Sequence, residues 1–203
     1  MELSLHKRTL ILSYFTVFYN ILEGILSIFI GLLSKSIALV GFGLDSFVES
    51  LSGGIIIWRF KKHGRISEIE EEKAEKRAIK LIAYAFFILG LYVLYESIKK
   101  IYMQEKPDPN LFGLIIPVIS IVIMLSLFYS KYKIGTSINS RSLLLDSKQT
   151  LACIFLSIAL LAGLGLNYLF GLWQADPIVG LIIVVFLFRE GYNALKEEKL
   201  CSC

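Results

Sequence analysis

The chain has 203 residues, of which 56% are hydrophobic and 19% are charged, and its mean hydropathy is +0.68. A soluble domain of this length carries more charge and fewer apolar residues, so the composition excludes an ordinary soluble protein and indicates a membrane protein. The net charge of +4 does not point to nucleic acid, because the basic residues follow the connections between the apolar stretches.

Six stretches are long and apolar enough to cross a bilayer as helices, which takes roughly 20 apolar residues each. The first is too long for the apolar core of a signal peptide and has no small-residue cleavage site. We therefore predict an all-α membrane protein in which residues 1–203 form a single bundle of six transmembrane helices. In chain order the expected spans are about 9–33, 37–59, 79–101, 111–130, 142–169 and 175–195.

The basic residues predict how the bundle is oriented. With the N-terminus in the cytosol, 15 of the 21 Lys and Arg fall on the cytosolic side, four on the outside, and two inside or near spans. Positive residues accumulate on the cytosolic side of membrane proteins. We therefore expect both termini in the cytosol and the cell membrane as the location. This count assigns Lys131 to a cytosolic segment and Lys99 and Lys100 to an outside segment.

The second stretch carries two acids, Asp45 and Glu49, in an otherwise apolar run. A spacing of four places both side chains on one helical face, one turn apart. Carboxylates at bilayer depth are costly, and they usually face a bundle interior where they mark an ion or proton path. Two oxygen donors in this arrangement can form half of a divalent-cation site. The alternative is a structural pair bonded to backbone or to a lysine such as Lys148.

The fifth stretch carries a second polar group, Asp146, Gln149 and Cys153. Each has a structural alternative to a role as metal ligand. Asp146 can pair with Lys148 or cap its helix, Gln149 can form an interhelical hydrogen bond, and Cys153 can pack between helices as a small apolar residue. Glu23, in the first stretch, is either part of an access path or hydrogen-bonded to a neighbouring helix.

Two sequence elements give the chain a resemblance to the cation diffusion facilitator family. Ser34-Lys-Ser36-Ile-Ala-Leu39, followed by Asp45-x-x-x-Glu49, resembles that family's Ser-x-Ser, Ala-Leu and (His/Asp)-x-x-x-Asp element. In the fifth stretch, Asp146-x-x-Gln149-x-x-x-Cys153 resembles its Asp-x-x-His-x-x-x-Asp partner. Weaker matches in the same order are Asn20 and Glu23, Glu96, Gly163–Gly165, and Asp176-Pro177 followed by Gly191.

The resemblance implies a six-span, cation-efflux-like bundle that exports divalent metals. It implies that the second and fifth spans pack antiparallel, so that Asp45 and Glu49 face Gln149 and Cys153, with Asp146 beside them. Carboxylate and thiolate ligands suit Zn²⁺ or Cd²⁺, here as transported ions and not as a bound cofactor. Exchange against protons is expected because protons and metal compete for the same ligands. The resemblance also implies a homodimer, although the family often dimerises through a cytosolic C-terminal domain that we expect to be absent here.

Other functions stay open. The departures from the family pattern at Glu49, Gln149 and Cys153 leave room for a non-transporting metal sensor or accessory protein of the same fold. A further alternative is a transporter for another cation or a small amine. An enzyme is not expected, because both histidines fall outside the spans and no catalytic serine or zinc-protease element occurs. The terminal Cys201-Ser202-Cys203 either chelates a soft cation near the inner mouth or has no role.

Overall fold

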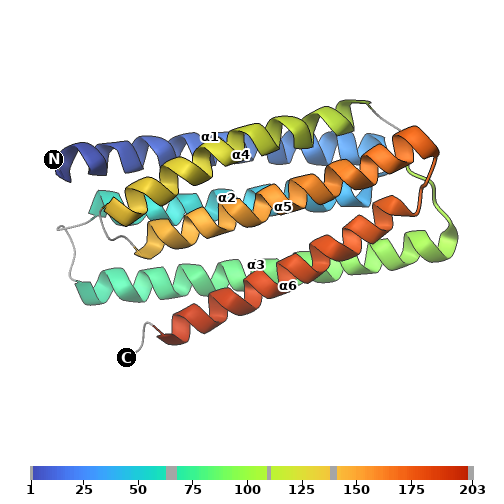
Figure 1. Ribbon diagram of the computed structural model, residues 1–203. Coiled ribbons are helices and arrows are strands. Elements are labelled where there is room, and N and C mark those ends of the chain that lie inside the picture. Colours follow the sequence, from blue (N-terminus) through green and yellow to red (C-terminus); the bar gives the residue numbers. More distant parts are fainter. Residues whose placement is uncertain (1, 63–67, 109–110, 138–140, 201–203) are drawn as a thin grey trace.

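The computed structural model describes residues 2–62, 68–108, 111–137 and 141–200, and helices are the only regular secondary structure in these ranges (Figure 1). Five helices contain segments long and apolar enough to cross a membrane, and these lie in α1, α2, α4, α5 and α6. The predicted all-α fold is therefore confirmed, and five of the six expected spans meet this criterion. The helices are α1 (Glu2–Leu33), α2 (Ile37–Lys62), α3 (Glu68–Met103), α4 (Leu111–Ser137), α5 (Arg141–Phe170) and α6 (Ala175–Leu200).

The helices pack in pairs, α1 along α2, α4 along α5, and α3 along α6. Figure 1 shows α1, α2, α4 and α5 grouped together, with the α3–α6 pair beside them. The start of α1 and the end of α6 lie at the same end of the bundle, which we call the inner end. Residues 34–36, 104–108 and 171–174 connect helices at the opposite, outer end. The chain therefore crosses the bundle an even number of times.

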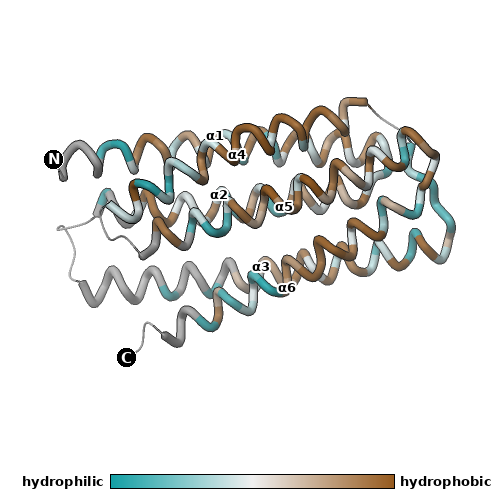
Figure 2. Tube along the Cα trace, in the orientation of Figure 1, coloured by the Kyte–Doolittle hydropathy of each residue, from teal (hydrophilic) through white to brown (hydrophobic). Residues whose placement is uncertain are grey.

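The outward surface of the bundle is apolar, whereas much of its interior is polar. Phe18, Phe29 and Val122 are more than 60% exposed, and Figure 2 shows hydrophobic residues along most of α4. Such a surface suits contact with lipid chains, which do not drive apolar side chains inward as water does. On α1 the buried face is a polar stripe at spacings of four and three, formed by Thr9, Ser13, Thr16, Asn20, Glu23 and Ser27.

Glycines allow α1 and α2 to approach closely at one point. A Cβ atom added to Gly43 would lie 2.9 Å from the carbonyl oxygen of Gly24, and one added to Gly24 would lie 3.0 Å from that of Gly43. Small residues at helix contacts are the usual means of tight packing in membranes. The close contact therefore fixes the face that α1 presents to α2.

An apolar core joins the two parts of the bundle. Leu39 and Phe42 on α2 pack with Phe86 on α3, and with residues of α5 and α6. A smaller cluster continues the contact between α2, α3 and α6 through Val40, Val93 and Val184. This packing places one side of α2 against the α3–α6 pair and leaves another side facing α5.

Polar contacts between three residues connect the helices at the outer end. We call these residues, Ser36, Lys100 and Asp176, the outer clasp. The buried Asp176 carboxylate accepts hydrogen bonds from the Ser36 hydroxyl and, at 3.0 Å, from the Ile37 amide, and it lies 3.7 Å from the Lys100 ammonium. Lys100 also donates to the Lys35 carbonyl oxygen. Ser36 accepts from the Leu39 amide, as expected of an N-cap. The clasp thus ties α2, α3 and α6 together.

The helix bounds correct two assignments from the sequence. Lys100 was assigned to an outside segment, but it is buried in the outer clasp, because Asp176 supplies a partner for its charge. Lys131 was assigned to a cytosolic segment, but it lies within α4, which continues to Ser137, and its side chain is fully buried in the bundle. His63 and Cys201-Ser202-Cys203 lie outside the described residues.

Candidate functional site

The two acids of α2 lie in the interior of the bundle and face α5. Asp45 is 5% exposed and Glu49 is fully buried, near the middle of α2. The Cys153 thiol donates to Asp45 Oδ2 at 3.3 Å. The structure therefore brings together the second-span and fifth-span elements identified in the sequence, with Asp45 and Cys153 in direct contact.

One turn nearer the inner end, Glu49 belongs to a network that includes a buried lysine. The Thr150 hydroxyl lies 2.9 Å from Glu49 Oε1, and the Lys131 ammonium donates to Thr150 Oγ1 at 2.8 Å. Lys131 also lies 2.8 Å from Asp146 Oδ2 and 3.8 Å from Glu49 Oε1. We call Asp45, Glu49, Lys131, Asp146, Thr150 and Cys153 the polar cluster.

The cluster is ordered along the bundle because α2 and α5 run in opposite directions. Asp45 pairs with Cys153 toward the outer end, Glu49 with Thr150 in the middle, and Asp146 with Lys131 toward the inner end. A cation entering from the inner end along α5 would therefore meet the Asp146–Lys131 pair first.

Two carboxylate oxygens in the cluster have neither a hydrogen-bond donor nor an ion-pair partner among the described residues. These are Glu49 Oε2 and Asp146 Oδ1, both inaccessible to solvent. An unpartnered carboxylate oxygen in the interior loses its hydration without compensation. The cluster therefore has unfilled capacity to bind a cation or a donor.

Two further polar residues of α5, Gln149 and Lys148, do not belong to the polar cluster. Gln149 is only partly buried, and Thr150, not Gln149, lies opposite Glu49. Lys148 is exposed, so the partner of Asp146 and Glu49 is Lys131 and not Lys148. Sequence reasoning missed Thr150 and Lys131.

A pattern in the sequence could have identified Thr150. Asp146, Thr150, Cys153 and Ser157 follow one another at spacings of four, three and four, which places all of them on a single helical face. Ser157 extends this face outward, where its hydroxyl lies 3.1 Å from Ser120 Oγ of α4. Lys131 gave no comparable signal, because its position next to the last apolar residues of α4 is also typical of a helix end.

Glu23 lies in a neighbouring network between α1 and α2. Its carboxylate accepts from Tyr19 OH at 2.7 Å and from Ser46 Oγ at 2.9 Å. Both carboxylate oxygens thus have a donor, and the expected hydrogen bond to a neighbouring helix is present. Asn20, one turn away on the same buried face, has no partner for its amide among the described residues. This network lines the side of α2 that faces α1.

The cluster does not form a closed metal-binding arrangement. Within the described ranges, no three His, Cys, Asp or Glu side chains gather in a way that could hold a metal ion. The acids are instead divided, Asp45 with Cys153 and Glu49 with Asp146, and Lys131 bridges the second pair. Simultaneous contact of both pairs with one ion would require their side chains to move.

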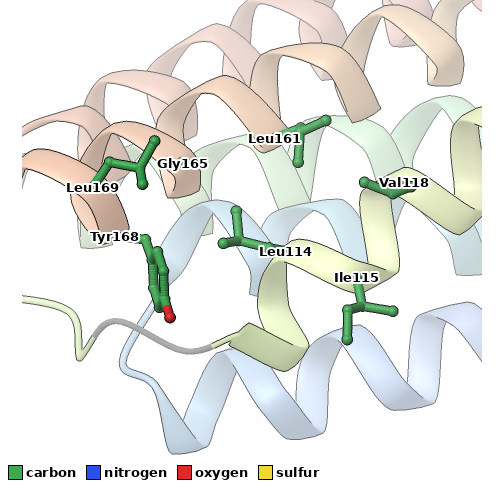
Figure 3. Close-up of a pocket in the computed structure, with 7 residues that line it drawn as sticks. All are labelled: Leu114, Ile115, Val118, Leu161, Gly165, Tyr168 and Leu169. Carbon is green, nitrogen blue, oxygen red and sulfur yellow. The ribbon is translucent and has the colours of Figure 1, made fainter.

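A separate groove of about 490 Å³ lies between the outer halves of α4 and α5 (Figure 3). Its wall carries no Asp, Glu, Lys, Arg, His or Cys side chain, so it offers nothing to hold a metal ion. The groove is a hollow in the apolar surface and not part of the polar cluster. It is lined by Leu114, Ile115, Val118, Leu161, Gly165, Tyr168 and Leu169.

Comparisons with known proteins give a matching family and several similar proteins. Residues 13–200 match the cation efflux transmembrane domain. Transmembrane protein 163 of Xenopus laevis is 19% identical over 94% of this chain and 67% of its own length. The cadmium, cobalt and zinc/H(+)-K(+) antiporter of Bacillus subtilis (strain 168) is 23% identical over 95% and 62%. An uncharacterized transporter of Methanocaldococcus jannaschii is 25% identical over 92% and 66%. The chain spans about two thirds of the length of these curated relatives.

Proposed function

The chain belongs to the cation efflux family, and from that premise we propose that it moves divalent metal ions such as Zn²⁺ and Cd²⁺ out of the cytosol in exchange for protons. The observation that carries the proposal is the buried polar cluster. Three carboxylates and one thiol from α2 and α5 lie in the interior of the bundle, and acids buried in this way in a membrane protein typically mark an ion or proton path. The Bacillus subtilis relative is named as an antiporter of cadmium, cobalt and zinc.

In this proposal Asp45, Glu49 and Cys153 supply ligands to the transported ion. Carboxylate oxygen together with sulfur favours Zn²⁺ or Cd²⁺ over Mg²⁺, Ca²⁺ or Mn²⁺. Gln149 or Asp146 completes the set, and each must turn toward Glu49 to do so. Proton exchange follows from the same groups, because a thiol or carboxylic acid must lose its proton before it binds metal.

We further propose that all six helices cross the membrane, with the inner end in the cytosol. α3 is long enough to span, its residues 79–101 are mostly apolar, and it packs along α6. The inner end carries most of the basic residues, in agreement with the orientation of membrane proteins in general.

A non-transporting metal sensor or accessory protein is the second candidate. The observation that favours it is Lys131, whose ammonium already holds two of the acids. A sensor would bind metal without carrying it across. Transport by the purified protein in liposomes therefore separates the two functions.

The test is flux of Zn²⁺, Cd²⁺, Mn²⁺, Fe²⁺ and Co²⁺ into liposomes containing the purified protein, with and without a pH gradient. We expect Zn²⁺ and Cd²⁺ to move fastest and a proton gradient directed against the metal to accelerate them. Asp45→Asn and Glu49→Gln should each abolish flux while the protein remains folded. Asp108→Asn, which removes an exposed carboxylate at the outer end, is the matched control. Near-normal flux in a folded Asp45→Asn, Glu49→Gln double variant would refute the proposal.

A further inference from the structure

The polar cluster contains one positively charged side chain, that of Lys131. The transport proposed above assigns no role to this charge. The Lys131 side chain is fully buried. An isolated ammonium in such a place is very costly, and it persists where acids and hydrogen-bond acceptors surround it. Here those partners are Asp146, Glu49 and Thr150, at 2.8, 3.8 and 2.8 Å.

The charge of the cluster depends on this lysine. Asp45, Glu49 and Asp146, counted as ionised, carry three negative charges, and Lys131 carries one positive charge. With Cys153 as the neutral thiol that donates to Asp45, the metal-free cluster therefore has a formal charge of −2, equal and opposite to the charge of one divalent cation. Without Lys131 the charge would be −3, and without Asp146 it would be −1.

The two unpartnered oxygens indicate where the added cation belongs. Lys131 approaches Asp146 through Oδ2 and Glu49 through Oε1, whereas Asp146 Oδ1 and Glu49 Oε2 have no donor among the residues described. Lys131 thus approaches only one carboxylate oxygen of each acid, and the second oxygen of each can still accept a cation or a hydrogen bond. Glu23, the acid on α1, has two donors of its own and contributes no unpartnered oxygen.

We infer that Lys131 is a tethered counter-charge that tunes the cluster to doubly charged cations, with Asp146 as its partner and not as an indispensable metal ligand. This inference rests on the proposed function, since it concerns the ion that the cluster accepts. Lys131 offsets the third carboxylate, so Asp45 and Glu49 are left to balance the two charges of the metal. In the absence of metal, the same ammonium holds Glu49 and Asp146 in place.

The experiment is a double-mutant cycle on the two partners, read as Zn²⁺ affinity by titration calorimetry of the purified protein in detergent. Lys131→Gln leaves three carboxylates without an internal counter-charge and should bind Zn²⁺ about tenfold tighter or more. Asp146→Asn should bind it about tenfold more weakly or more. The double variant should return to within about threefold of the unmodified protein, because the two charge changes cancel.

The matched control is Lys133→Gln, two residues further along α4, where the lysine is exposed and lies over the Tyr129 ring. Its Zn²⁺ affinity should be unchanged. A second readout is maximal flux, which should fall in Lys131→Gln because a more tightly held ion leaves more slowly. Lys131→Arg keeps the charge and should retain the Zn²⁺ affinity of the unmodified protein.

Each outcome decides the inference. If Lys131→Gln binds Zn²⁺ no more tightly, the tuning role is refuted while the proposed function stands. If that variant does not fold, Asp146→Asn and the double variant decide, and a double variant as weak as Asp146→Asn refutes the inference by making Asp146 an indispensable ligand. If the unmodified protein binds no Zn²⁺ at all, the proposed function itself is refuted and this inference with it.

Discussion

Replacing Asp176 by alanine should loosen the outer end of the bundle more than any other single change there. The substitution removes the carboxylate that joins the start of α2 to α3 and α6. Lys100 would remain buried without its ionic partner, and the Ser36 hydroxyl and the Ile37 amide would each lose their acceptor. Among the described residues, only the hydrogen bond to the Lys35 carbonyl oxygen would then stabilise the Lys100 ammonium.

The expected magnitude follows from these contacts. Breaking a buried ion pair by removing one partner costs about 3–5 kcal/mol, chiefly because the other charge stays buried. The two hydrogen bonds to a charged acceptor are each worth about 1.5–3 kcal/mol, but they share one carboxylate and do not add. We therefore expect Asp176→Ala to lower the free energy of unfolding by about 3–5 kcal/mol. Asp176→Asn, which keeps one acceptor oxygen, should cost less.

The assay is reversible unfolding of the purified protein by denaturing detergent, followed by circular dichroism. Asp108→Ala is the control, because its ion pair with Lys35 is exposed at 3.9 Å and is worth at most about 1 kcal/mol. Adding Lys100→Met to Asp176→Ala should recover part of the loss by removing the unpaired charge. A loss below 1 kcal/mol in Asp176→Ala, or no recovery in the double variant, would refute the reasoning.

Three further predictions concern other parts of the chain. Cys153→Ser should weaken Cd²⁺ and Zn²⁺ transport more than Mn²⁺ transport, because the thiolate is the soft ligand, and competition between metals measures this. Gly43→Ala should destabilise the protein by about 1–3 kcal/mol in thermal unfolding, since the added methyl would press on the Gly24 carbonyl group. With the tail cysteines replaced by serine, Lys106→Cys should react with impermeant thiol reagents from outside the cell and Lys61→Cys only from the cytosol.

Each of these predictions has an outcome that contradicts it. An unchanged order of metals in Cys153→Ser would make that residue a packing element only. Gly54→Ala is the control for Gly43→Ala, because a methyl group there meets open space, and equal stability of the two variants would contradict the close approach of α1 and α2. Labelling of Lys106→Cys and Lys61→Cys from the same side would contradict the six-span topology.

The helices were predictable from the sequence because their apolar stretches are long and contain few charged residues. Five helices contain apolar segments that overlap the expected spans, and Gly171, with a left-handed φ of +66°, follows the end of α5, which lies one residue from the predicted boundary. The inner ends were less predictable. α4 and α6 continue as helices beyond their apolar residues to Ser137 and Leu200, since polar helix ends carry no hydropathy signal.

The site was predictable only where its spacing was regular. Asp45 and Glu49 lie together in the interior as their spacing of four required, and Cys153 meets Asp45. Gln149 was chosen from the resemblance, but the side chain opposite Glu49 is that of Thr150. Lys131 could not be assigned, because whether a lysine near a helix end turns outward to the interface or inward to an acid depends on the neighbouring helix and not on its own sequence.

The outer clasp holds the α3–α6 pair to α2 at one end, so a rigid movement of the pair would be a rotation about a point near Lys100. Glu68, at the far end of α3, lies 32 residues from Lys100, or about 48 Å along the helix. A rotation of about 10° around the point near Lys100 would displace that far end by about 8 Å and leave the clasp almost where it is. Movement of this pair would therefore widen the inner end of the bundle far more than the outer end, and it would uncover the face of α2 that the pair packs against.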